Sequence, residues 1–245
     1  TEIYTLSLHD ALPILIPAYQ KFIEWQFRTL KQNNLIVQGN HPVGWCPNDQ
    51  NPVSQHDTLG DVEPDFTEYI IMKFSIEDEI IPIATLRPET LFGVTNLWIN
   101  PEIVYKKTKV NDETWIISSE CAHKLSFLDK TIEIIGDVKG SEFIGKNVKS
   151  PISSEEFLIL PASFVSATTG TGIVMSVPAH APYDYQALED IKNGNTNDLS
   201  ESVRDQVKAI NPITIITTEG FGEVPAEDVI KRMNITNQND PKLED

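Results

Sequence analysis

The sequence predicts a mixed α/β fold in which a barrel-like β-sheet is surrounded by helices, with a small helix-hairpin appendage at the N-terminal end. Runs rich in β-branched and aromatic residues crowd the middle of the chain, and helical patterns are interspersed irregularly, without a strict alternation of strand and helix. A hydrophobic content of 40% and a charged content of 22% over 245 residues are ordinary for a globular chain that buries a sizeable core.

The N-terminal part of the chain divides into two segments. Residues 1–14 fit poorly with the rest of the chain and resemble a translated sequencing-adapter segment, so we interpret them as non-native. Residues 15–62 form the predicted appendage. Pro17 should open a helix there, because the missing N–H of proline costs nothing at a helix start. Tyr19 begins an apolar face that recurs at helical spacing.

A hairpin and a segment that resembles a zinc knuckle complete the appendage. Residues 35–38 and 42–45 should pair as strands around the tight turn Gly39-Asn40. The knuckle-like segment carries Cys46 and His56, but one cysteine and one histidine are too few for a structural zinc site, which needs four ligands. We therefore expect no metal here.

Residues 63–245 form the strand-rich remainder and carry the predicted barrel-like sheet. The expected strands cover residues 67–76, 79–84, 96–99, 105–110, 114–118, 131–138, 157–160, 173–177 and 213–217. The expected helices cover residues 119–125, 184–191, 198–209 and 225–233. The run 173–177 is typical of a central strand, and Asp184 is suited to cap the N-terminus of the helix that comes after it.

The net charge, the apolar runs and the cysteine content exclude several classes of protein. A formal net charge of -17 argues against a non-specific nucleic-acid binder, although lysines between residues 106 and 149 leave a local basic patch open. No apolar run approaches the roughly 18 residues of a membrane span, and the first residues lack the features of a signal peptide. Cys46 and Cys121 can form at most one bridge, so free thiols in a reducing compartment are expected. These observations favour a cytoplasmic protein without a membrane partner.

One stretch, ATLRPETLFG at residues 84–93, ends an apolar strand in a group of polar side chains. Pro88 disfavours a helical conformation at Arg87, and the backbone N–H groups of the adjoining turn are free to bind an anion or to orient a water. The alternative is an ordinary helix start initiated by proline.

A second stretch, GTGIVMSVPAHAPYD at residues 170–184, has the same character. His180 and Asp184 are candidates for a metal-binding or acid–base pair, although a lone histidine near a strand end is more often structural. Asp184 is suited to bind a cationic ammonium group, to cap a helix, or to do both. The sequence contains no G-x-x-x-x-G-K-[ST] phosphate loop and no G-x-S-x-G nucleophile elbow.

Together the two stretches resemble the editing-site motifs of leucyl-tRNA synthetases of the archaeal and eukaryotic type. The resemblance is carried by ATLRPETLFGVTNLWIN at residues 84–100 and GTGIVMSVPAHAPYDY at residues 170–185. Residues 22–57 resemble the zinc-like module that precedes the editing insert. Residues 63–245 are thereby identified as an aminoacyl-tRNA editing domain. Valyl- and isoleucyl-tRNA synthetases have related editing domains, but the leucyl form is matched better.

The resemblance implies part of a leucine–tRNA ligase in which a positioned water hydrolyses wrong amino acids, such as isoleucine and norvaline, from tRNA-Leu. The implied catalytic residues are Thr85, Arg87, Thr90 and Asp184. The implied substrate-binding residues are Thr90, Met175, Val177, His180 and Asp184, with no metal. Thr90 would be the steric gate that excludes leucine, and Asp184 would hold the α-ammonium group. A positioned water and oxyanion donors suffice for ester hydrolysis, which fits the absence of a protein nucleophile.

The synthetic core of the family is missing from these residues, since neither a HIGH-like nor a KMSKS-like ATP motif is present. Editing would need no cofactor, and ATP with Mg²⁺ would serve only the synthetic core of the parent enzyme. The implied partners are the mischarged 3′ end of tRNA-Leu and the rest of the synthetase in cis, and the oligomeric state stays open. A function of a different class remains, namely a non-catalytic module that binds an aminoacyl group or tRNA.

Overall fold

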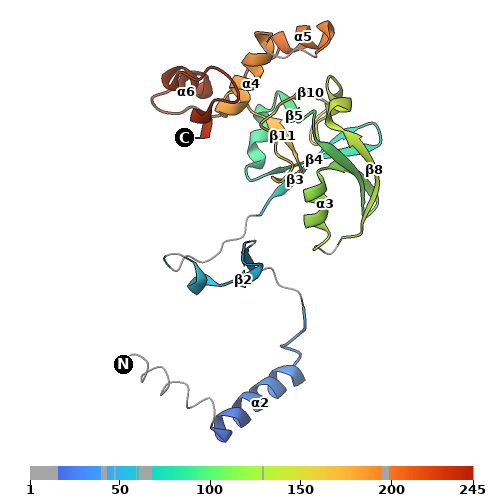
Figure 1. Ribbon diagram of the computed structural model, residues 1–245, viewed down its shortest axis with the longest axis vertical. Coiled ribbons are helices and arrows are strands. Elements are labelled where there is room, and N and C mark those ends of the chain that lie inside the picture. The colour runs from blue at the N-terminus through green and yellow to red at the C-terminus, as the bar shows by residue number, and fades with distance from the viewer. Residues whose placement is uncertain are drawn as a thin grey trace. The chain divides into compact units, whose positions relative to one another are not determined.

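The computed structural model describes residues 16–39, 43–46, 48–58, 60, 68–128, 130–194 and 199–244 (Figure 1). The chain divides into two compact units, Thr1–Thr67 and Glu68–Asp245, and each is described by itself. The segment at residues 1–14 and the boundary predicted between residues 62 and 63 both lie outside the described residues.

The described part of the first unit contains one long helix. Helix α2 spans Pro17–Gln32, so the predicted start at Pro17 is confirmed. Its large apolar side chains Phe22, Trp25 and Phe27 are 53%, 58% and 61% exposed, and no residue of this helix is buried within the part of the chain that the structure describes. A single 3-10 turn, η2 (Gln55–Asp57), closes the described part of this unit.

The hairpin of the first unit lies later in the sequence than predicted. Strand β1 (Gly44–Cys46) pairs antiparallel with β2 (Asn51–Val53), whereas residues 35–38 form no strand. Gln50 adopts a positive φ of 51° in the turn before β2, so the chain reverses there. The predicted pairing of residues 35–38 with 42–45 is therefore wrong.

A sheet of nine strands forms the second unit, in the order β11-β5-β10-β9-β3-β4-β7-β6-β8. Its strands are β3 (Ile70–Ile76), β4 (Glu79–Thr85), β5 (Asn96–Ile99), β6 (Val104–Val110), β7 (Glu113–Ile117), β8 (Ile132–Lys139), β9 (Asn147–Lys149), β10 (Glu156–Pro161) and β11 (Ile173–Ser176). The sheet is mixed, because β5 runs parallel to β10 and β4 parallel to β7, while the remaining pairs are antiparallel.

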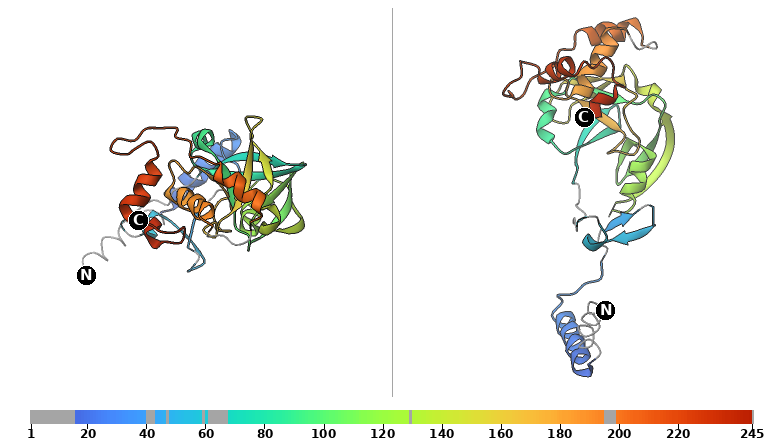
Figure 2. Two further views of the ribbon diagram at one scale, coloured as in Figure 1. Left: turned by 90° about the horizontal axis from the view of Figure 1, so that it is seen from above. Right: turned by 60° about the vertical axis from the view of Figure 1, so that its left-hand side comes forward.

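The sheet curls upon itself so that β4 lies against β11, its first strand in the order (Figure 1, Figure 2). The strands from β11 to β4 thus enclose an interior, and β7, β6 and β8 extend beyond it. The predicted fold class, a mixed α/β domain around a barrel-like sheet with surrounding helices and an N-terminal helix-hairpin appendage, is confirmed.

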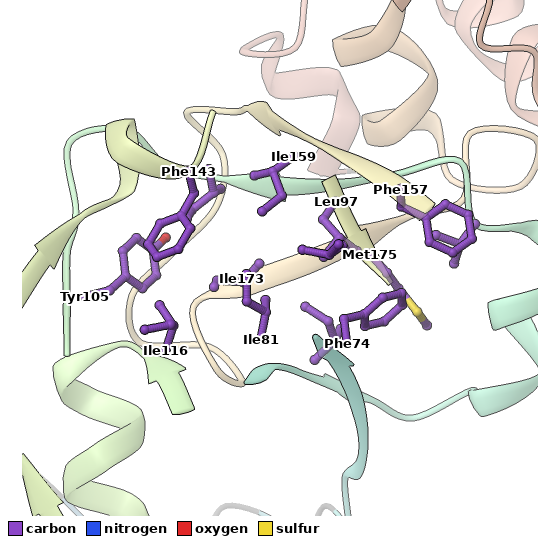
Figure 3. Close-up of a cluster of buried hydrophobic side chains, with 14 of the residues drawn as sticks. Phe74, Ile81, Leu97, Tyr105, Ile116, Phe143, Phe157, Ile159, Ile173 and Met175 are labelled. Carbon is purple, nitrogen blue, oxygen red and sulfur yellow. The ribbon is translucent and has the colours of Figure 1, made fainter. Parts of the chain in front are cut away.

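Two hydrophobic cores lie on opposite faces of the same strands. The interior of the curled sheet is filled by side chains such as Phe74, Ile81, Leu97 and Ile159, which point toward one another in Figure 3. Because successive residues of a strand face opposite sides, the neighbour of Leu97 on β5, Trp98, belongs to the second core. That core lies between the sheet and the helices that come after it in the chain.

In the described part of the second unit, four helices and three 3-10 segments surround the sheet. They are η3 (Pro88–Gly93), α3 (Ser119–Leu125), η4 (Gly140–Phe143), α4 (Pro182–Lys192), α5 (Glu201–Lys208), α6 (Pro225–Met233) and η5 (Pro241–Glu244). Helix α4 contacts both α5 and α6, and its buried Leu188 and Ile191 belong to the second core. The described residues include no helix that is long and apolar enough to cross a membrane.

The structure corrects three local predictions. Helix α4 begins at Pro182 after Ala181, so Asp184 lies inside the helix and is not its N-cap. Helix α5 is capped by Ser200, whose hydroxyl accepts the N–H of Val203 at 3.4 Å, and the predicted cap Asp198 lies outside the described residues. Strand β11 is the first strand of the sheet order and not a central one.

Residues 213–217, predicted as a strand, form none. This segment bonds to polar groups and not to a neighbouring strand. The N–H of Ile215 donates to His180 Nε2 at 3.0 Å, and Thr214 donates through its hydroxyl to the carbonyl of Glu223 at 2.6 Å. Ile213 and Ile216 are 46% and 62% exposed and Ile215 lies beside Gly93, so the apolar alternation of the segment does not mark a place in the sheet.

Candidate functional site

The first motif is a tight turn held by two threonines. Strand β4 ends at Thr85, and its hydroxyl oxygen accepts the N–H of Arg87 at 3.1 Å. Pro88 opens η3, and it keeps Arg87 out of the helical region, at φ -131° and ψ 80°. Thr90 donates to the carbonyl of Arg87 from its hydroxyl at 2.7 Å and from its N–H at 3.1 Å.

These hydrogen bonds leave the two hydroxyls with opposite capacities. Thr85 uses an acceptor lone pair, so its O–H remains able to donate. Thr90 uses its O–H, so its lone pairs remain able to accept. Both side chains are partly exposed, and the guanidinium-bearing Arg87 between them is exposed. The turn therefore offers a donor, a cation and an acceptor within the six residues from Thr85 to Thr90.

The two motifs lie side by side. At the start of the second motif, a Cβ built on Gly170 would lie 3.2 Å from Ala84 Cβ, so this turn abuts the end of β4. At the other end, a Cβ on Gly93 would lie 3.1 Å from Val177 Cγ1. The N–H of Thr95 also donates to the carbonyl of Ser176 at 3.1 Å. Segments 81 to 86 residues apart in the sequence thus meet at both ends of β11, with the end of β4 beside its start and residues 93–95 beside its end.

Asp184 provides a buried carboxylate beside this junction. Its side chain is 6% exposed and lies in the first turn of α4. The N–H of Val177 donates to Oδ2 at 2.7 Å, and the indole N–H of Trp98 donates to Oδ1 at 2.9 Å. Burial raises the pKa of the Asp184 carboxyl to about 7, against the lowering effect of these two hydrogen bonds.

Trp98 was not among the residues singled out from the sequence. It lies in the middle of the buried strand β5, where a large aromatic side chain is explained by packing alone. A signal was nevertheless present. A fully buried tryptophan needs an acceptor for its N–H, and the strand alternation places Trp98 on the opposite face from Leu97 and Ile99.

The remaining predicted site residues occupy different surroundings. Met175, 6% exposed, and Val177 are buried and belong to the interior core of the sheet. His180 lies in the turn before α4, and its Nε2 accepts the N–H of Ile215, so that nitrogen carries no proton. His180 and Asp184 bind different partners and are not joined as an acid–base pair. A shallow hollow of about 480 Å³, lined by residues 214–217, adjoins the His180 contact.

The described residues hold no group of three or more His, Cys, Asp and Glu side chains placed to bind a metal ion. A thiol nucleophile is also disfavoured in the second unit, because burial raises the pKa of Cys121 to about 11. In the first unit, the Cys46 thiol lies 3.4 Å from Asp49 Oδ2 and donates to it.

Comparison with known proteins decides the family. Residues 68–215 match the family model described as the leucyl-tRNA synthetase editing domain. The chain belongs to the leucyl-tRNA synthetase family. The matched residues contain both motifs and the Asp184 carboxylate, and they begin where the second unit begins. The leucyl-tRNA synthetase resemblance drawn from the two motifs is therefore confirmed.

Archaeal leucine–tRNA ligases are among the similar proteins. The chain is 47% identical to the ligase of Methanothrix thermoacetophila and 49% identical to that of Methanosarcina barkeri, in each case over 99% of this chain and 25% of the relative. The chain thus spans about a quarter of the length of these relatives.

Solved structures of the same family share the fold. The crystal structure of GlLeuRS-CP1 superposes with a TM-score of 0.60 at 28% identity, over 72% of this chain and 80% of that chain. The P. falciparum cytosolic leucyl-tRNA synthetase editing domain superposes with a TM-score of 0.61, over 69% of this chain and 65% of that chain. Its identity of 23% supports the fold alone.

Proposed function

We propose that this chain is the editing part of a leucine–tRNA ligase and that it hydrolyses the ester of tRNA-Leu mischarged with isoleucine, norvaline or a similar aliphatic amino acid. Such editing is needed because one missing or shifted methylene offers a synthetic pocket only about 1–3 kcal/mol of discrimination. The observation that carries the proposal is the junction of the two motifs beside a buried carboxylate, within residues matched by the editing-domain family.

The proposed reaction is a direct attack of water on the ester carbonyl carbon. The bond from that carbon to the ribose oxygen breaks, and the products are a free amino acid and the 3′ hydroxyl of tRNA. Thr85 keeps a free O–H, which suits it to donate to the developing oxyanion or to the water. Thr90 keeps free lone pairs, which suit it to accept a hydrogen bond from the water and so to orient it. Arg87 braces this turn.

Substrate recognition is assigned to both motifs. Asp184 would hold the α-ammonium group of the misattached amino acid, since a carboxylate is the natural partner of a cation in a buried site. Thr90 would be the steric gate against leucine. The pocket near the aminoacyl group would be lined by Met175, Val177 and His180. The two buried ones, Met175 and Val177, suit contact with an aliphatic side chain.

The proposed reaction uses water alone and needs no cofactor. ATP with Mg²⁺ would serve only the synthetic core of the parent ligase. The proposed partners are tRNA-Leu and the rest of the synthetase in cis, with the cytoplasm as the site of action. In a cytoplasmic ligase the acidic charge of -17 would leave most of the tRNA contact to other parts of the enzyme.

A deacylation assay tests the proposal. The chain is mixed with isoleucyl-tRNA-Leu or with leucyl-tRNA-Leu, and the release of each amino acid is compared with release in buffer. We expect faster release of isoleucine and background release of leucine. Isoleucine release at the background rate, in a preparation that the ligase of Methanosarcina barkeri does edit, would refute hydrolysis by this chain. Retention of the tRNA without hydrolysis would favour the binding module.

A further inference from the structure

The Asp184 carboxylate is buried without a cation. In the described residues its hydrogen-bond donors are the N–H of Val177 and the indole N–H of Trp98, and no ion pair includes it. Lys192 on α4 pairs with Glu189 on the same helix, at 3.0 Å. Buried carboxylates are ordinarily paired with a charge, so this one is poised for a cation that arrives from outside.

We propose that Trp98 is a positioning residue of the editing site, whose indole N–H fixes the Asp184 carboxylate in the orientation that receives the ammonium group of the substrate. The inference rests on the proposed function, because it assigns Trp98 a role through the residue that would bind the aminoacyl group. Trp98 itself would touch neither the substrate nor the attacking water.

The indole ring is held too firmly to follow the carboxylate. Trp98 is fully buried in the second core, in the company of Leu158, Leu160 and Leu188. Its ring also packs edge-on against Phe164, with 6.1 Å between the ring centroids and 70° between the planes. The direction of its N–H is therefore set by the core, and the carboxylate must align with it.

Two donors, one on each oxygen, stop the carboxylate from rotating. The N–H of Val177 holds Oδ2 and that of Trp98 holds Oδ1, and each oxygen keeps a further lone pair. With the Val177 bond alone, the group could turn about its Cβ–Cγ bond. Binding of the ammonium group would then cost the free energy of ordering the carboxylate. The second bond, from Trp98, avoids this cost because it orders the carboxylate before the substrate binds.

The Trp98→Phe variant removes the N–H and keeps an aromatic ring in the core. The chain offers a matched control in Trp115→Phe, since Trp115 is 5% exposed and donates its indole N–H to Glu113 Oε2 at 2.8 Å on β7. Each variant loses one bond from an indole to a carboxylate. We expect Trp98→Phe to lower kcat/KM for isoleucyl-tRNA-Leu about tenfold or more, the effect of losing a hydrogen bond to a charged group. Trp115→Phe should stay within about twofold, like most changes remote from a site.

A double-mutant cycle that combines Trp98→Phe with Asp184→Asn separates a positioning role of Trp98 from a packing role. If Trp98 acts through Asp184, the Trp98→Phe change should alter the residual activity of Asp184→Asn by less than about twofold, because coupled residues are not additive. An equal loss in both backgrounds, or equal activity of Trp98→Phe and Trp115→Phe, would overturn the proposal. These outcomes require a wild-type chain that edits, so they are distinct from failure of the proposed function.

A second variant guards against misfolding of Trp98→Phe. Replacement of Trp98 by benzothienylalanine keeps the size of the indole ring and substitutes sulfur for the N–H. Circular dichroism and urea denaturation should match the wild type more closely than those of Trp98→Phe. The same loss of kcat/KM with this replacement supports the proposal, and full activity refutes it.

Discussion

The buried carboxylate of Asp184 should make folding stability depend on pH in an unusual direction. Burial raises its pKa from the ordinary 3.8 to about 7 in the folded protein. Between these values the folded protein holds the proton and the unfolded chain releases it. The stability that this group contributes is therefore full below about pH 4 and is lost as the pH rises through about 7.

The size of the loss is set by the two pKa values. A shift of this size corresponds to roughly 4 kcal/mol between acid and alkaline pH, of which about 2–3 kcal/mol falls between pH 5 and pH 8. Asp184→Asn carries no ionisable group at this position. The free energy of unfolding of Asp184→Asn minus that of the wild type should therefore become more positive by about 2–3 kcal/mol from pH 5 to pH 8.

Urea denaturation followed by circular dichroism at several pH values measures this difference. Glu113→Gln is the control, because hydrogen bonds from Lys73 and from the indole of Trp115 hold the pKa of Glu113 below its usual range. The contribution of Glu113 is constant between pH 5 and pH 8 and is lost only on further acidification. A difference between Asp184→Asn and the wild type that stays flat over this interval would show that the carboxylate is ionised throughout.

Four further outcomes are expected. Thr90→Ala should release leucine from leucyl-tRNA-Leu, whereas Thr90→Val, which keeps the volume, should spare it, and equal sparing by both would remove the gate role. Asp184→Ala should lower kcat/KM by the equivalent of about 2–5 kcal/mol. The rate of editing by the wild type, after subtraction of spontaneous hydrolysis, should rise with pH through about 7, because the Asp184 carboxyl ionises there. Gly172→Ala should destabilise the chain by about 2–4 kcal/mol, since φ is +82° and the new Cβ would lie 2.7 Å from Ser118 Cβ. Gly220→Ala, with the same φ and nothing within 4 Å, should cost less in the same denaturation assay.

Local sequence patterns predicted the elements that end in the site. The run leading to Thr85 is apolar up to the polar turn, so the end of β4 could be located to within a residue. Pro88 marks the start of η3, because proline is preferred in the first turn of a helix, whereas the predicted start of α4 at Asp184 lies two residues after the observed start at Pro182. The strand at Ile173–Ser176 was equally visible from its β-branched residues.

Contacts between distant segments were beyond such patterns. The bond from Trp98 to Asp184 joins residues 86 positions apart, and nothing near either residue in the sequence specifies the other. A carboxylate at the third residue of a helix has the same local sequence signature as an N-cap. The N-cap interpretation of Asp184 was therefore wrong, because the sequence does not reveal its distant partner Trp98. For residues 213–217, apolar alternation suggested a strand, but His180 takes the N–H that a strand neighbour would have bonded.

The order of strands in the sheet imposes an order on the assembly of the site during synthesis. Within the described sheet, strand β5 (Asn96–Ile99) pairs only with β10 and β11, which leave the ribosome some 60 residues or more later. Because translation adds about 5–20 residues per second, β5 waits several seconds with both edges unpaired. The Asp184 side chain arrives later still, on α4. An unfinished chain therefore lacks the assembled candidate site, and its unpaired strand edges are open to pairing with another chain.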